Sequence, residues 1–265
     1  PEGGEDATTH LRRQYAGTLT MADEYLGTLF DELERQNSFD DTLIILTTDH
    51  GHLIGEHNAT GKNRWHVWNE LGNIPMVVKL PGNLHAGQRR KQLTQNIDLM
   101  PTLLDYCNIP ITHPIHGESL RGVLENDAPV KRQGAIYGWF GMPVNVTDGH
   151  YTYFRAAARE DNGPLFQHFQ IPTSYSHHDV PRGQFFQETE IGQFLPYTDM
   201  PVFRSRWTSK RWNTVKDSLL FDIHSDPGQE HNLAGTEMEK TYIELLRETM
   251  AKMDAPSAQY ERLGL

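Results

Sequence analysis

The chain has 265 residues, a formal net charge of −11 at pH 7, 37% hydrophobic residues and a single cysteine. This length can bury the core of one large α/β domain, or of one domain with a smaller appendage. The acidic balance argues against a general nucleic-acid-binding protein, the single cysteine excludes an internal disulfide framework, and no run reaches the ~18 apolar residues that a membrane span needs.

The first periodic segment predicts a long amphipathic helix over residues 9–36. Its apolar residues recur at steps of three and four positions, from Leu11 to Leu33. Gly17 and Gly27 mark the places where such a helix could break, because glycine weakens a helix interior. Residues 37–41 then predict a turn into a strand.

The next segment, residues 42–48, is apolar and β-branched. It is too short for a helix and lacks polar alternation, so it predicts a parallel strand buried on both faces. It ends on Asp49-His50-Gly51, the position beyond a strand where ligands bind in open α/β sheets. Residues 74–80 predict a second strand. The polar loop between the two strands is dense in metal-ligand and anion-binding residue types: His52, Glu56, His57, Lys62, Arg64 and His66.

The alternation of apolar and polar residues changes after residue 133. Short β runs follow one another without helices, and the Asp148-Gly149 pair predicts a tight turn between two of them. Such a succession indicates an antiparallel sheet and a domain boundary near residue 130. The three predicted strands cover residues 135–140, 144–147 and 151–156.

The last third of the chain begins with a segment, residues 159–215, that is rich in Gln, Pro, His and aromatic residues and has no clear period. So long an irregular segment indicates functional loops or a disordered insertion. A strand over residues 216–221 and an amphipathic helix over residues 238–253 follow. We therefore expect an α/β part in residues 1–130 and a small α+β domain in residues 131–265, with an antiparallel sheet and a C-terminal helix.

The ordered set Asp49-His50-Gly51, Gly55-Glu56-His57 and Gly61-Lys62 resembles the sulfatase family of the alkaline-phosphatase superfamily in both residue type and spacing. Further similarities, such as the turn that begins at Asp222, extend the resemblance over nearly the whole chain. It implies that residues 1–130 are the C-terminal part of an alkaline-phosphatase-like domain, with a mostly parallel sheet and flanking helices. It also implies hydrolysis of sulfate esters.

By this resemblance, Asp49 and His50 are metal ligands and Lys62 contacts the sulfate. Sulfatases usually hold Ca²⁺, which prefers oxygen ligands, whereas an imidazole ligand favours Mn²⁺ or Zn²⁺. The resemblance therefore favours calcium, and ligand chemistry leaves the other ions open.

Candidate substrate-binding residues are His57, Arg64 and His66. After Lys62 the chain departs from the family pattern, because the distance to the next strand is longer and tryptophans replace the usual Tyr or Phe. The roles of these three residues depend on that divergent stretch.

The nucleophile of the family is a formylglycine made from Cys or Ser in a Cys/Ser-x-Pro/Ala-x-Arg motif. Cys107 and Ser225 both lack this motif. The family also has a metal-binding Asp-Asp pair at the end of an early strand, whereas the Asp-Asp pair of this chain, residues 40–41, comes before a strand. We therefore expect a C-terminal portion of a sulfatase, inactive alone, with the formylglycine and the first strands upstream.

Two alternatives stay open: a phosphodiesterase or phosphonate hydrolase of the same superfamily, and a degenerate sulfatase-like domain that binds glycans. The expected partners are a sulfated small molecule or glycan and the missing N-terminal part of the catalytic domain. An uncovered core would also favour self-association, whereas neither nucleic acid nor a membrane span is expected. The resemblance favours a periplasmic or secreted location.

Overall fold

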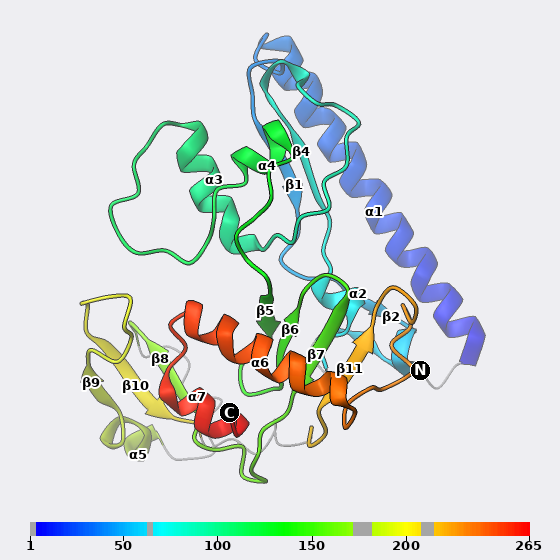
Figure 1. Ribbon diagram of the computed structural model, residues 1–265. Coiled ribbons are helices and arrows are strands. Elements are labelled where there is room, and N and C mark those ends of the chain that lie inside the picture. Colours follow the sequence, from blue (N-terminus) through cyan, green and yellow to red (C-terminus); the bar gives the residue numbers. More distant parts are fainter. Residues whose placement is uncertain (1–3, 63–65, 172–181, 208–214) are drawn as a thin grey trace. The chain divides into compact units, whose positions relative to one another are not determined.

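The computed structural model describes residues 4–62, 66–171, 182–207 and 215–265, and it shows a mixed α/β chain (Figure 1). The chain forms two compact units. Unit 1 comprises Pro1–Arg64, Trp68–Lys91 and Gly122–Ala128. Unit 2 comprises Trp65–Val67, Gln92–Arg121 and Pro129–Leu265. The division into two domains at residue 130 stays a prediction.

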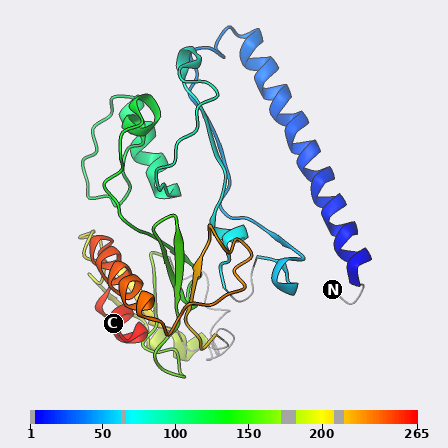
Figure 2. The ribbon, with the colours of Figure 1, turned by 45° about the vertical axis from the view of Figure 1, so that its right-hand side comes forward.

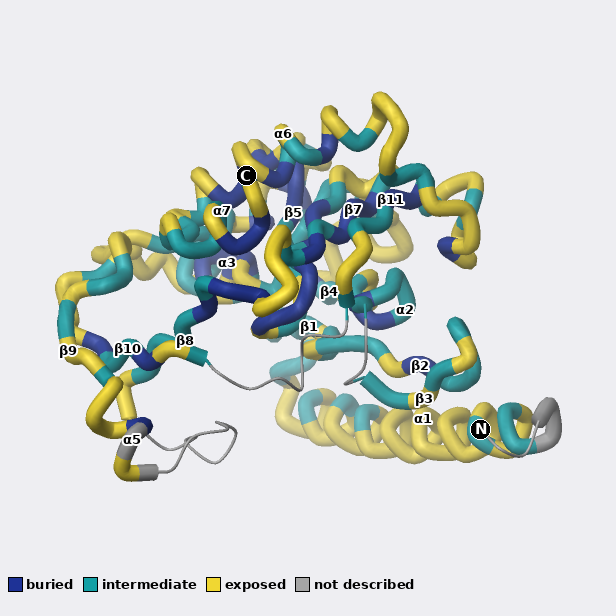
Figure 3. Tube along the Cα trace, turned by 90° about the horizontal axis from the view of Figure 1, so that it is seen from below, coloured by how far each residue is buried: buried dark blue, intermediate teal, exposed yellow. Residues whose placement is uncertain are grey.

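Helix α1, Gly4–Arg35, is the longest element of unit 1. It confirms the predicted N-terminal helix, and it runs unbroken through Gly17 and Gly27 (Figure 2). Most of its surface is exposed (Figure 3), including Leu19 at 62% and Tyr25 at 71%. None of the described helices combines the length and the apolar character that crossing a membrane would require.

Strands β1 (Ile44–Thr47) and β4 (Met76–Lys79) form a two-stranded ribbon in unit 1. They pair antiparallel. The prediction that the first strand is parallel to its neighbour is therefore wrong for β1 and β4. Burial on both faces is also wrong, because Leu46 is 48% exposed and Val77 is 60% exposed. An apolar run indicates that a strand can bury its side chains, but it does not indicate whether the neighbouring strand is parallel or antiparallel.

The segment between these two strands folds into short elements that shape the polar loop. Between β1 and β4, strands β2 and β3 form a hairpin around the short helix η1, and one turn of helix, α2, follows. The short elements η2 and α4 come after β4. Their bounds are β2 Leu53–Ile54, η1 Glu56–Asn58, β3 Thr60–Gly61, α2 Asn69–Gly72 and η2 Pro81–Asn83, with most of α4, Arg121–Asn126, also in this unit.

Unit 2 contains a four-stranded antiparallel sheet in the order β11-β7-β6-β5, which confirms the predicted antiparallel sheet. The Asp148-Gly149 turn forms as predicted, because Asp148 Oδ1 accepts the backbone N–H groups of His150 and Tyr151, both at 2.8 Å. The strands are β5 Ala135–Gly138, β6 Val144–Thr147, β7 Tyr151–Arg155 and β11 Leu219–Asp222.

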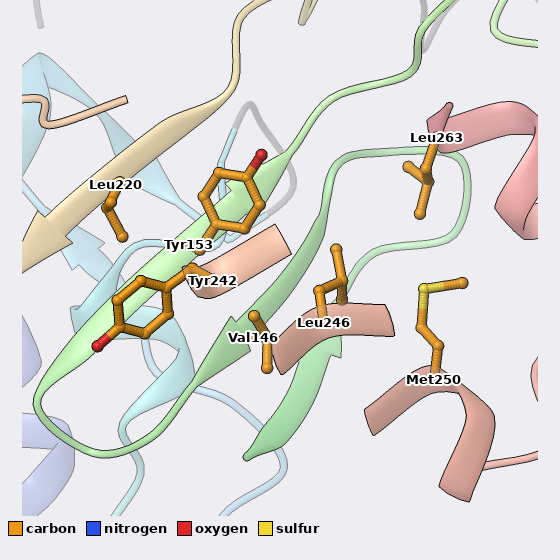
Figure 4. Packing of buried hydrophobic residues seen from close by; sticks show 7 residues of the cluster. All are labelled: Val146, Tyr153, Leu220, Tyr242, Leu246, Met250 and Leu263. Carbon is orange, nitrogen blue, oxygen red and sulfur yellow. The ribbon is translucent and has the colours of Figure 1, made fainter. Parts of the chain in front are cut away.

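The core of unit 2 lies between this sheet and helices α6 (Glu237–Lys252) and α7 (Ser257–Leu263). Helix α6 confirms the predicted C-terminal helix, and its apolar stripe faces the sheet (Figure 4). The fully buried cluster comprises Val146, Tyr153, Leu220, Tyr242, Leu246, Met250 and Leu263. Two shorter helices early in this unit are η3 Asn96–Asp98 and α3 Leu99–Tyr106.

Residues 159–215 differ from the irregular segment that their sequence indicated. Their described part forms a three-stranded antiparallel sheet in the order β8-β10-β9. These strands are short and pair across long loops, so their alternation is not visible in a local sequence window. The elements are β8 Phe166–Phe169, α5 Arg182–Gln187, β9 Glu190–Gly192 and β10 Val202–Arg206.

Candidate functional site

The turn after strand β1 carries Asp49, His50 and Gly51, and it is held against helix α2 in unit 1. The backbone N–H of Gly51 donates to the carbonyl of Leu71 at 3.0 Å. A Cβ atom at Gly51 would lie 1.8 Å from the carbonyl oxygen of Glu70. Glycine is therefore required here by the close approach of the α2 backbone, which places the two preceding side chains at the end of the strand.

The imidazole of His50 is oriented by its own turn. Its Nδ1 lies 2.8 Å from the carbonyl oxygen of Gly51, and because a carbonyl can only accept, Nδ1 carries the hydrogen. In the neutral ring this leaves a lone pair on Nε2. Metal-binding histidines in proteins have this arrangement, in which the second ring nitrogen donates to a backbone carbonyl or a carboxylate.

Two charged groups face the Nε2 atom of His50. The Asp49 Oδ2 atom lies 3.4 Å away, and the ammonium of Lys62 lies 2.5 Å away. Lys62 follows strand β3 directly, after Gly61, whose φ of +97° is in the region that favours glycine. The structure thus brings together the three residues that the sequence selected, while their roles stay predictions.

The carboxylate of Asp49 is 82% exposed. Desolvation raises the pKa of Asp49, but the charge that His50 can carry, the backbone N–H groups of the turn and the Lys62 ammonium outweigh it. The pKa of Asp49 therefore lies below its ordinary value, and the group is an anion at neutral pH.

The geometry of this pair fits two neighbouring ligands of one cation. Ligand atoms about 2.1–2.4 Å from a common ion are roughly 3.0–3.6 Å from each other, and the Asp49–His50 separation of 3.4 Å lies in that range. Among the residues that the structure describes, no group of three or more His, Cys, Asp or Glu side chains could hold a metal ion. A cation held by Asp49 and His50 would thus have two ligands from the described residues.

His57 has contacts of another kind. Its Nε2 lies 3.2 Å from Glu70 Oε2, and its ring stacks on Trp68 with 4.1 Å between the ring centres. These contacts attach the loop to helix α2. His66 belongs to unit 2, where its ring lies edge-on to Phe154 at 5.5 Å, and Arg64 lies outside the described residues. Substrate roles for these three residues stay predictions.

Sequence reasoning missed the side chains that support the loop. Glu56 accepts the backbone N–H of Ile54 at 2.7 Å and pairs with Arg12 of helix α1 at 3.1 Å, so it has a structural function. Thr48 lies directly before Asp49, and its hydroxyl oxygen is 3.4 Å from Asp49 Oδ1. Its position next to Asp49 in the sequence could have indicated the contact of Thr48. Nothing in the sequence indicated that Glu56 pairs with Arg12, which lies far away along the chain.

We expect Gly51→Ala to destabilise the chain by about 3 kcal/mol, the upper end of the usual cost of overpacking, because the added methyl collides with backbone. Gly17→Ala is the matched control: nothing lies within 4 Å of its Cβ position, and in a helix interior the change should stabilise by about 0.5–1 kcal/mol. Urea unfolding of both variants measures the difference. Equal stabilities would show that the turn does not depend on the close contact with α2.

The sequence of the chain is similar to that of known sulfatases. The sequence model of the family named Sulfatase matches residues 1–109. An N-acetylglucosamine-6-O-sulfatase of Bacteroides thetaiotaomicron is 31% identical over 135 residues, which are 50% of this chain and 24% of that protein. Residues 1–109 are therefore identified as sulfatase-family sequence, which confirms the resemblance for this part of the chain.

A second relative is the multifunctional alkaline phosphatase superfamily protein PehA of Trinickia caryophylli. It is 36% identical over 250 residues, which are 94% of this chain and 40% of PehA. A solved structure of a protein bound to its substrate D-glucosamine-2-N,6-O-disulfate matches with a TM-score of 0.64 and 20% identity, over 91% of this chain and 40% of that chain. The solved structure supports the fold alone. The chain thus spans less than half the length of the relatives that it matches.

Proposed function

We propose that this chain supplies two metal ligands and one sulfate-contacting lysine to a site that hydrolyses sulfate esters. The observation that carries the proposal is the orientation of His50, whose Nε2 faces both the Asp49 carboxylate and the Lys62 ammonium. A histidine in a solvated loop would not have its imidazole fixed in one tautomer between a carboxylate and an ammonium.

In this proposal Asp49 and His50 hold a divalent cation, which would stabilise negative charge on the sulfate oxygens when bound. The family resemblance favours Ca²⁺, and the imidazole ligand also suits Mn²⁺ or Zn²⁺. Lys62 presents a compact point charge, which suits a tetrahedral anion. Cys107 and Ser225 lack the formylglycine motif, so the nucleophile and the remaining ligands would come from outside these 265 residues.

The proposed substrate is a sulfated small molecule or glycan. Its support is indirect: one relative is a sulfatase of N-acetylglucosamine, and one protein of the same fold was solved with a disulfated glucosamine. Phosphoryl or phosphonyl ester hydrolysis is a second candidate, because PehA, which matches 94% of the chain, is named as a multifunctional member of the superfamily. The nucleophile motif distinguishes the two.

Unit 1 exposes apolar side chains on several elements. On helix α1, Leu19 and Leu29 are 62% and 52% exposed, and on the β1–β4 ribbon Val77 is 60% exposed. Exposed large apolar side chains favour association. We therefore infer that another protein segment covers these side chains, either the remaining part of the catalytic domain or a second copy.

The function proposal is tested with the 265-residue chain itself, assayed against 4-nitrophenyl sulfate and bis(4-nitrophenyl) phosphate with added Ca²⁺ or Mn²⁺. We expect no turnover above that of the Asp49→Ala variant, because covalent catalysis requires an activated nucleophile beside the cation. Turnover of either ester that disappears in Asp49→Ala would contradict the proposal, since it would place the nucleophile within these residues.

A further inference from the structure

We propose that a cavity in unit 2 binds a small molecule through a carboxylate or sulfate group. The cavity has a volume of about 140 Å³ and lies where the loop between β5 and β6 meets the segments that follow β7 and precede β11. It shares no residue with the Asp49–His50–Lys62 group. The lining residues that matter to the argument are Met142, Ala157, Ala158, Arg159, Asn162 and Lys216.

The size of the cavity suits one small ligand or one end of a larger one. An engineered cavity of about 150 Å³ in another protein accommodates a benzene molecule. Acetate and sulfate are smaller than benzene, so either fits without rearrangement of the walls. The lining combines methyl-bearing residues, such as Ala157 and Ala158, with charged ones, which is the mixture found in ligand pockets.

A buried cation lies directly behind the wall of this cavity. Arg262 is only 2% exposed, and its Nη1 and Nη2 atoms donate to the side-chain oxygen of Asn162 at 2.9 Å and to the carbonyl of Met142 at 3.2 Å. Both acceptors belong to cavity-lining residues. The third acceptor is the side-chain oxygen of Gln259, 3.0 Å from Nε.

All three of these acceptors are neutral, and in the described part of the chain no carboxylate forms an ion pair with Arg262. Burial removes the guanidinium from water and lowers the pKa of Arg262 to about 10. Removing a charge from water costs several kcal/mol unless an opposite charge lies nearby. An anion in the cavity would lie beyond Asn162 and Met142, the two lining residues that accept from Arg262, and would supply that charge.

Two cations, Arg159 and Lys216, line the cavity itself. Arg159 pairs with Asp161 at 2.7 Å, and Lys216 pairs with Glu160 at 3.4 Å, with both pairs about half exposed or more. Exposed ion pairs are weak, so either cation can turn from its acid toward a ligand anion. Glu160 is the one acid among the cavity-lining residues that the structure describes. Arg159 and Lys216 each have an acid beside them, so Arg262, behind the wall, is the cation whose charge favours an anionic ligand.

Methyl NMR tests the proposal, because Met142, Ala157 and Ala158 are reporters inside the cavity. The 265-residue chain is labelled at Met and Ala methyl groups and carries Lys62→Gln, which removes the anion contact of the proposed active site. Sodium sulfate and sodium acetate are titrated separately, with sodium chloride keeping the ionic strength constant. We expect the three methyl signals to shift and to saturate with at least one anion, and the anion that binds identifies the group recognised.

The Arg159→Gln/Lys216→Gln double variant should weaken this binding at least ten-fold, which corresponds to about 1.4 kcal/mol. The matched control, Lys240→Gln/Arg247→Gln, removes the same charge from exposed positions of helix α6 and should leave the affinity unchanged. Absence of saturable shifts with both anions would overturn the proposal. Equal affinity in the double variant and the control would overturn it too. Because Lys62 is replaced in every sample, neither outcome depends on the proposed active site.

Discussion

Replacing Lys62 by alanine is expected to slow sulfate ester hydrolysis about 10²–10³-fold in an enzyme that joins this chain to a formylglycine-bearing segment. A preorganised charge that meets developing negative charge contributes an effect of this size. The Lys62 ammonium lies 2.5 Å from His50 Nε2, next to the proposed cation site, so it is close to where a bound sulfate would lie. The measurement is kcat/KM for 4-nitrophenyl sulfate.

Two further variants make this experiment specific. Lys62→Arg keeps the charge but replaces a compact ammonium by a planar guanidinium, so we expect partial recovery of activity. Arg13→Ala removes a cation from the exposed surface of helix α1 and should leave the rate unchanged. A Lys62→Ala enzyme as active as the Arg13→Ala enzyme would show that Lys62 is a loop residue without a catalytic function.

Asp98→Ala is expected to lower the free energy of unfolding by about 3–5 kcal/mol, the usual cost of breaking a buried ion pair. Asp98 is fully buried. Its carboxylate accepts the backbone N–H groups of Gln95 and Glu118, at 2.8 and 2.9 Å, and the Nη2 group of Arg132. The variant leaves the 9% exposed Arg132 with only the more distant carboxylate of Glu118, at 3.8 Å from its Nε, and two backbone donors lose their acceptor.

The control for this prediction is Glu237→Ala. Glu237 pairs with Lys240 at 2.8 Å on helix α6, but its side chain is 88% exposed, so the change should cost less than about 1 kcal/mol. Urea unfolding of the two variants under identical conditions compares them. A loss of stability for Asp98→Ala as small as that for Glu237→Ala would contradict the structural function assigned to the buried pair.

The elements that the sequence predicted well are those whose causes are local. The Asp148-Gly149 turn forms because one carboxylate caps the two following N–H groups, and helix α6 forms because its apolar residues recur on one face. The antiparallel pairing of β1 with β4 and the sheet within residues 159–215 depend on partners distant in sequence. Local periodicity carries no information on such partners.

The candidate site shows the same limit. The grouping of Asp49, His50 and Lys62 was predictable because the spacing of their motifs matches a known family. The contacts of His57 with Glu70 and Trp68 were not, because those partners lie beyond the point where the sequence departs from the family pattern. A histidine in a ligand-rich loop can equally serve to hold the loop in place.

Binding of Mn²⁺ to the 265-residue chain tests the central claim, that Asp49 and His50 are ligands of one cation. Mn²⁺ broadens the NMR signals of nuclei close to it, so small additions identify the binding residues. We expect the signals of Asp49 and His50 to broaden first, added Ca²⁺ to restore them, and Asp49→Ala to abolish the effect. Broadening that leaves His50 sharp, or that persists unchanged in Asp49→Ala, would contradict the assignment of this pair as metal ligands.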